Sequence, residues 1–178
     1  HHAAIVITLI VLLMNQRGYF PFLNKSHLGD FSRYIFMLCI IWGYFWFAEF
    51  MLIWYANIPE ETAYFLPRVR GEGWRFYFFA NIIINWFVPF VLLMPKATAR
   101  NKTVLKLVIH ILIIGQFFDL YVQIFPGTVG TQVLGFQEIG IFVGFAGLFM
   151  LVFGWALSRA NLYPVKHPYM EECKGHHT

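Results

Sequence analysis

Ionisable side chains interrupt the long apolar stretches of this chain at Glu49, His110, Asp119 and Glu138. Burying a charge is costly unless the group is paired, hydrogen-bonded or neutralised by a proton. Residues of this kind therefore tend to face a partner or an internal cavity. Acids and histidines in such places can donate and accept protons, so proton transfer is the chemistry to consider first.

Asp119 has polar neighbours at helical spacing. Gln116, Asp119 and Gln123 fall at i, i+3 and i+7, so they line one face of a helix, which they share with Leu112 and Leu120. Two interpretations stay open: side chains that hydrogen-bond one helix to another, or a path for protons or water. Glutamines alone favour the first interpretation, and an acid among them favours the second.

The elements that must position these residues are predicted to be membrane-spanning helices. Of 178 residues, 59% are hydrophobic and 12% are charged, and the mean hydropathy is +0.61. A soluble domain usually carries about 25% charged residues. The composition therefore predicts an all-α integral membrane protein. It excludes a nucleic-acid-binding domain, because the basic residues are dispersed between apolar spans.

Apolar spans predict five transmembrane helices, at about 3–14, 31–56, 76–94, 104–125 and 135–157. Residues 1–157 then form a transmembrane bundle, and 158–178 form a tail. The first span is shorter than the roughly 20 residues that cross a bilayer, so we expect it to be the end of a longer helix. An acid against lipid is costly, so Asp119 and its stripe should face the interior of a four-helix bundle made by the first four spans.

The distribution of Lys and Arg predicts the orientation. Of 13 such residues, only Arg68, Arg70 and Arg75 lie on one side of the predicted membrane. By the positive-inside rule the other side is cytoplasmic. The tail 158–178 is then cytoplasmic, and the loop 57–74 lies outside.

The third span contains a potential helix irregularity. Asn81 and Asn85 are one turn apart and are followed by Pro89. Pro89 has no N–H to donate to the carbonyl of Asn85, which predicts a kink. We expect the two asparagines to satisfy backbone groups near that kink.

The fifth span is predicted to pack closely against another helix. Small residues on one of its faces allow such an approach, and they are Gly140, Gly144, Gly147 and Gly154. Glu138 lies near the outer end of this span, where its carboxylate can reach interfacial water.

Glu49 lies deeper in its span. Trp54 and Tyr55 have the character of an interfacial aromatic belt, and the sequence Asn57-Ile58-Pro59 should end the helix. Glu49 is then about 10 Å below the outer end by helical rise. At that depth it must be protonated, paired, or directed into a cavity.

These positions define a candidate proton path, consisting of Glu49, His110, Asp119, Gln116, Gln123 and Glu138. Glu49 and Asp119 are predicted at a similar depth, where two carboxyls could share a proton, with His110 on the inner half. The structural alternative is a buried, protonated Glu49 bonded to a backbone carbonyl. Both interpretations stay open.

Redox centres are not expected on this chain. Cys39 and Cys173 form no CxxC pair, no CxxCH haem motif is present, and His110 is the only histidine deep in a span. The sequence therefore predicts no metal ion, haem or iron–sulfur cluster of its own.

Three segments carry a resemblance to a known family. FMLIWYANIPEET (50–62), GEGW (71–74) and LYPVKHPYMEECKGHH (162–177) resemble the NrfD-like, polysulfide-reductase-type membrane subunits of bacterial alternative complex III. The similarity is greatest to the second of the two large subunits of this type, and it covers nearly the whole chain. It implies a ten-helix bundle with both ends inside, of which this chain would be the C-terminal half.

The resemblance also implies a function in the bacterial cytoplasmic membrane. Such a complex oxidises quinol and passes electrons to a periplasmic acceptor of the cytochrome c type. The implied partners are the paired NrfD-like subunit, an iron–sulfur subunit, multihaem cytochromes c and a terminal oxidase, which carry the clusters and haems, with lipid or quinone nearby. This subunit would be non-catalytic, serving as a scaffold or a proton conductor. The alternatives are a quinone-binding subunit, or an unrelated membrane carrier or channel.

Overall fold

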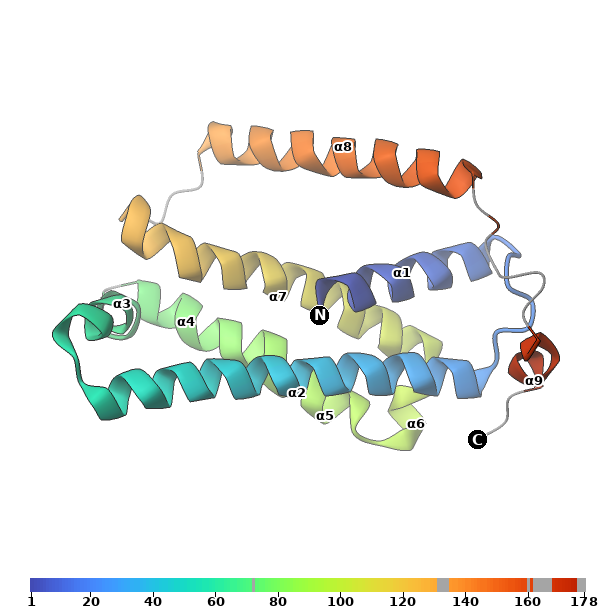
Figure 1. The fold of residues 1–178 in the computed structure, drawn as a ribbon, viewed down its shortest axis with the longest axis horizontal. Coiled ribbons are helices and arrows are strands. Elements are labelled where there is room, and N and C mark those ends of the chain that lie inside the picture. Colours follow the sequence, from blue (N-terminus) through green and yellow to red (C-terminus); the bar gives the residue numbers. More distant parts are fainter. Residues whose placement is uncertain (72, 131–134, 160, 162–167, 176–178) are drawn as a thin grey trace. The chain divides into compact units, whose positions relative to one another are not determined.

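The computed structural model describes residues 1–71, 73–130, 135–159, 161 and 168–175 (Figure 1). Every regular element among them is a helix. The chain divides into two compact units, His1–Thr131 and Gln132–His177, and each is described by itself.

Four helical segments are long and apolar enough to cross a membrane, as expected of a multi-pass membrane protein. They are α2 (Lys25–Ala56), the continuous segment Trp74–Leu93, α7 (Lys102–Thr128) and α8 (Phe136–Arg159). The prediction of five was wrong. The first apolar span forms α1 (His2–Gln16), whose 15 residues rise about 22 Å, less than the roughly 30 Å of bilayer hydrocarbon.

The third span is not one regular helix. It consists of α4 (Trp74–Ile82), the π-helical turn η1 (Ile83–Phe87) and α5 (Val88–Leu93). The N–H of Val88 donates to the carbonyl of Ile83, five residues earlier. The predicted irregularity is therefore present, and it lies just before Pro89. π-Turns of this kind are rare and often occur at functional sites.

Two of the spans are longer than predicted because an asparagine caps each one. Asn24 Oδ1 accepts N–H groups of Ser26 and His27, at 2.8 and 3.1 Å, so α2 begins at Lys25 rather than near residue 31. Asn101 Oδ1 accepts the N–H of Thr103 at 2.9 Å and begins α7, after the short helix α6 (Lys96–Ala99). Such caps satisfy N–H groups that have no partner within the helix.

The outer loop predicted at 57–74 is mostly a helix, α3 (Pro59–Arg70). Asn57 ends α2, as predicted, in the left-handed conformation with φ of 49°. Pro59 occupies the first turn of α3 together with two acids, and two arginines occupy the last turn. This order suits the helix dipole, so the sequence did contain a signal for α3.

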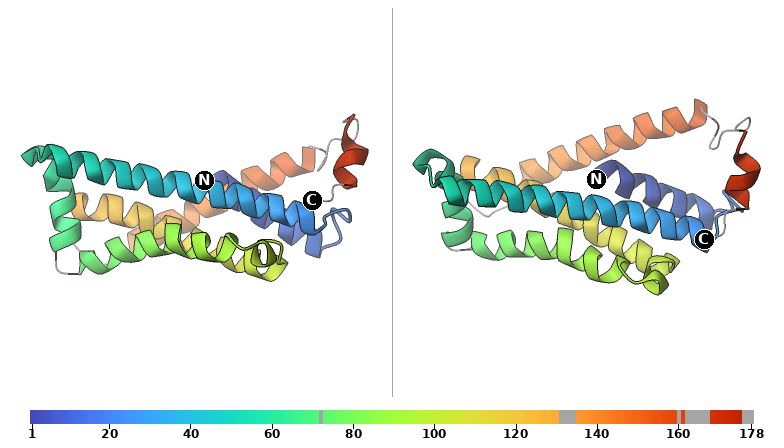
Figure 2. Two further views of the ribbon diagram at one scale, coloured as in Figure 1. Left: turned by 90° about the horizontal axis from the view of Figure 1, so that it is seen from below. Right: turned by 60° about the horizontal axis from the view of Figure 1, so that its bottom comes forward.

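The first unit has its core between α1, α2, α5 and α7. Figure 2 shows the α4–α5 segment extending along α7, and its η1 and α5 parts also pack against α2. Buried apolar side chains come from all four helices, and they include Ile5, Leu12, Ile35, Cys39, Leu93, Leu105, Val108, Ile109 and Leu112. The helices formed by the first four apolar segments therefore share one core, and α7 contributes most to it.

The second unit contains α8 and the short helix α9 (Met170–Lys174). A Cβ built at any of the four stripe glycines of α8 would meet no atom within 4 Å. The packing function of that stripe stays a prediction. Within the tail 158–178, residues 160, 162–167 and 176–178 lie outside the described residues.

Candidate functional site

Asp119 lies inside the first unit, with 6% of its surface exposed, as predicted. Its carboxylate accepts hydrogen bonds from three N–H groups on two other helices. Asn81 Nδ2 donates at 2.8 Å from α4, and the indole Nε1 groups of Trp42 and Trp46 donate at 3.2 and 3.3 Å from α2. All three partners are N–H donors, and the carboxylate oxygens of Asp119 are their acceptors.

Three carboxamides, one each on α4, η1 and α7, extend this arrangement. Gln116 Nε2 donates to Asn85 Oδ1 at 2.6 Å, Asn85 Nδ2 donates to Asn81 Oδ1 at 2.6 Å, and Asn81 donates to Asp119. Every amide thus donates in the direction of the acid. We call Trp42, Trp46, Asn81, Asn85, Gln116 and Asp119 the polar cluster.

The far end of this chain of amides is incomplete. Gln116 Oε1 is buried and has no hydrogen-bond partner among the described residues. A buried acceptor of this kind is usually satisfied by an internal water.

The close approach of α7 to η1 makes the polar cluster possible. Asn85 Nδ2 donates to the carbonyl oxygens of Gly115, at 2.9 Å, and Asn81, at 3.2 Å. A Cβ at Gly115 would lie 2.6 Å from Asn85 Oδ1 and from Ile84 Cγ2, so only glycine fits there. Asn85 does satisfy backbone carbonyls, as predicted, whereas the Asn81 side chain donates to Asp119 instead. The sequence did not reveal that the two asparagines hold Asp119 and Gln116.

Arg68 was assigned to a loop by the sequence, but its side chain is buried, with 3% of its surface exposed. Its Nε donates to the carbonyl of Val122 at 2.9 Å and its Nη2 donates to the carbonyl of Gln123 at 2.6 Å. Pro126 has no N–H for the Val122 carbonyl, so the guanidinium occupies the place of that missing donor. The proline inside α7 was the available signal.

Tyr64 holds the same guanidinium from within α3. Arg68 Nη1 donates to the Tyr64 carbonyl, and Arg68 Cζ lies 3.6 Å from the centre of the Tyr64 ring. Burial lowers the pKa of Arg68, while Tyr64 and the Glu49 carboxylate favour its charged form. Burial raises the pKa of Tyr64, and Arg68 opposes that effect.

Glu49 is exposed on α2, about one turn beyond Trp46. The interpretation of Glu49 as buried and bonded to a backbone carbonyl was wrong. Its carboxylate is close enough to Arg68 and Tyr64 to influence both electrostatically. No hydrogen bond joins it to Asp119 in the part of the chain that the structure describes.

The structure does not bring the other candidates into the polar cluster. His110 is exposed, its Nδ1 lies 2.7 Å from the Lys106 carbonyl, and it is about 13 Å from Asp119 along α7.

Gln123 is also exposed, although it was predicted to share the buried stripe. In the buried core that α7 shares with α1, the residues of α7 extend from Leu105 to Leu112, more than two turns before Gln123. Glu138 is half-buried in the first turn of α8, in the second unit.

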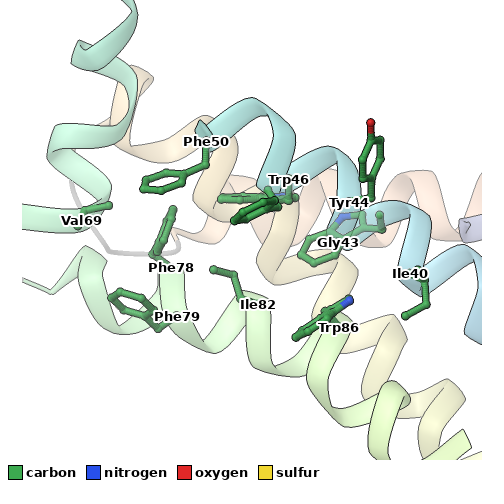
Figure 3. A pocket seen from close by; sticks show the side chains of 12 residues that line it. Ile40, Gly43, Tyr44, Trp46, Phe50, Val69, Phe78, Phe79, Ile82 and Trp86 are labelled. Carbon is green, nitrogen blue, oxygen red and sulfur yellow. The ribbon is translucent and has the colours of Figure 1, made fainter. Parts of the chain in front are cut away.

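An apolar cleft of about 520 Å³ adjoins the polar cluster. Figure 3 shows side chains of α2 and of the α4–η1 segment facing each other across it. Trp42 and Trp46 line the cleft and also donate to Asp119, so their N–H groups are already engaged. At Gly43 a Cβ would lie 2.3 Å from Trp86 Cδ1, so the glycine makes room for that indole.

Comparison with known proteins adds no assignment: no protein-family model matches the chain, and no curated protein is significantly similar to it. Among the described residues, no three His, Cys, Asp or Glu side chains gather as ligands for a metal ion. That the chain has no redox centre of its own stays a prediction.

Proposed function

We propose that this chain is a non-catalytic membrane subunit of a quinol-oxidising respiratory complex of the alternative complex III type, related to the second of its two NrfD-like subunits. On this proposal it is the C-terminal half of a ten-helix bundle in the bacterial cytoplasmic membrane, with its C-terminus in the cytoplasm. Iron–sulfur clusters and c-type haems belong to partner subunits. The three resembling segments support the assignment, and one of them forms the corner between α2 and α3.

Within such a complex we assign the chain a scaffolding function, and the polar cluster is the observation that carries it. The cluster joins α2, α4 and α7 through one buried acid, and it joins η1 to α4 and α7 through the Asn85 amide. Each hydrogen bond between its amides comes from a carboxamide N–H, and carboxamides are not among the side chains that relay protons. The cluster therefore suits cross-linking of helices better than proton conduction.

The alternative functions have weaker support. A quinone-binding subunit needs donors for the quinone carbonyls, and two of the three indoles that line the cleft, Trp42 and Trp46, already donate to Asp119. A secondary carrier typically has paired broken helices. Among the described residues, α4–η1–α5 is the one span interrupted by a non-α turn.

Affinity purification tests the proposal. The tagged protein would be extracted from its native membranes in mild detergent and examined by haem staining, mass spectrometry and quinol-dependent reduction of a cytochrome c. We expect multihaem cytochromes c and an iron–sulfur protein to elute with it in fixed ratio. A membrane protein of similar abundance carrying the same tag is the control. Elution without haem proteins, from membranes that do contain the complex, would contradict the proposal.

A further inference from the structure

We propose that the first unit binds one phospholipid molecule, with an acyl chain in the apolar cleft and the phosphate at Arg75. This inference rests on the membrane-spanning character of α2 and α4–η1–α5. It does not depend on membership of alternative complex III.

The shape and lining of the cleft fit a hydrocarbon chain. Its volume of about 520 Å³ is within the range of small-molecule sites, roughly 300–1,000 Å³. Its wall on α2 extends from Ile40 to Phe50, which corresponds to about 15 Å by helical rise and matches the depth of one leaflet of a bilayer. The facing wall consists mainly of aromatic and aliphatic side chains, including Phe78, Ile82 and Trp86 (Figure 3).

The chemistry of the cleft argues against a polar head group inside it. The indole N–H groups of Trp42 and Trp46 point to Asp119 and are engaged. A ligand whose buried part is all hydrocarbon loses no hydrogen bonds on entering. A ligand with buried carbonyls would have to compete with Asp119 for these two donors, and Trp86 is the third indole of the lining.

A cation lies at the end of the cleft nearest α3. A second hollow, lined by Arg75 and Phe76 among others, shares Phe79 with the cleft, so the two adjoin. Arg75 and Phe79 are one turn apart on α4 and therefore share a face. The Arg75 side chain is exposed in the first turn of a membrane-spanning segment, which is the level of lipid phosphates. Arginine binds phosphate oxygens with paired hydrogen bonds.

The ligand can be counted by native mass spectrometry. The purified assembly would be stripped of loosely held lipid and titrated with phosphatidylglycerol, and separately with diacylglycerol, which has the chains but no phosphate. We expect one phospholipid per chain to be retained at least tenfold more strongly than diacylglycerol. Equal retention of the two, or displacement of the phospholipid by one equivalent of quinone, would overturn the proposal.

Two pairs of variants locate the site. Ile82→Trp fills the cleft, and Ile113→Trp makes the same change at an exposed position of α7. Arg75→Gln removes the cation, and Arg70→Gln makes the same charge change at an exposed position at the end of α3. We expect Ile82→Trp and Arg75→Gln to retain phospholipid at least fivefold less strongly than the wild type. The controls Ile113→Trp and Arg70→Gln should retain it as the wild type does, and Arg75→Lys should retain it in part. Both arginine variants change the surface and leave the core intact. If Arg75→Gln and Arg70→Gln lower phospholipid retention by the same factor, the proposal is also overturned.

Discussion

Arg68 Nε donates to the carbonyl oxygen of Val122 at 2.9 Å, which connects α3 to the one turn of α7 where Pro126 removes a backbone donor. A buried arginine is costly unless its N–H groups are used. Here the acceptors are backbone carbonyls, and two of them belong to α7. The cation therefore joins a helix that was predicted to be a loop to the helix that carries Asp119.

Replacing Arg68 by Met should lower the free energy of unfolding by about 1–3 kcal/mol, because buried carbonyls lose their donor. In a Pro126→Ala background, which restores an N–H to α7, the same replacement should cost less, with a coupling of roughly 0.5–3 kcal/mol. Thermal unfolding of the four proteins in detergent measures both values. Arg70→Met, at an exposed position of α3, is the matched control and should change stability by less than about 0.5 kcal/mol. Additive effects of the two changes would disprove the proposed relation between Arg68 and Pro126.

Asp119→Asn should destabilise the first unit by about 1–3 kcal/mol, since at least one of the three N–H donors then faces an amide NH₂ group. Asp119→Leu should cost more, because all three donors lose their acceptor. Thermal unfolding and the tryptophan emission spectrum report the change, as Trp42 and Trp46 are two of the donors. Gln123→Leu, one turn further along α7 and exposed, serves as the control. If Asp119→Leu is as stable as the wild type, Asp119 does not hold the helices together.

Gly115→Ala should destabilise the protein by roughly 1–3 kcal/mol, because the added Cβ would overlap Asn85 Oδ1 and Ile84 and separate α7 from η1. Gly127→Ala is the matched change in the same helix, where an added Cβ would meet no atom within 4 Å. It should be neutral or stabilising by up to about 1 kcal/mol through helix propensity. Chemical denaturation followed by circular dichroism compares the two. Equal effects would show that the close approach at Gly115 is not required.

Glu49→Gln and His110→Gln should leave the ratio of protons taken up to electrons transferred unchanged, because neither side chain joins the polar cluster. The measurement uses the assembled complex in sealed vesicles, with quinol turnover and proton uptake recorded together. Asp119→Asn is measured at a temperature where it is folded, and it too should retain the wild-type ratio. A lowered ratio in Glu49→Gln, with turnover retained, would restore the proton-path interpretation and contradict a purely scaffolding function.

Much of the architecture could be predicted because bilayer hydrocarbon imposes a simple rule on the chain. Long apolar stretches must become helices, since their backbone groups have no water to bond. The spans beginning near residues 31, 76, 104 and 135 are all present as long helices. Their starting points were less accurate, because Asn24 and Asn101 extend α2 and α7 by capping.

The sequence by itself determined that Asp119 is buried, since an acid at helical spacing from Gln116 within an apolar span has few other places to lie. The tertiary structure decided which donors meet it. In the sequence, Trp42 and Trp46 had no feature that set them apart from other apolar residues. Asn81 and Asn85 were expected only to satisfy backbone groups near the kink in their own helix. Helical periodicity assigns a residue to a face, but the neighbours that cover that face come from distant parts of the chain. For that reason Gln116 is inside and Gln123 outside, although both lie on the same predicted stripe.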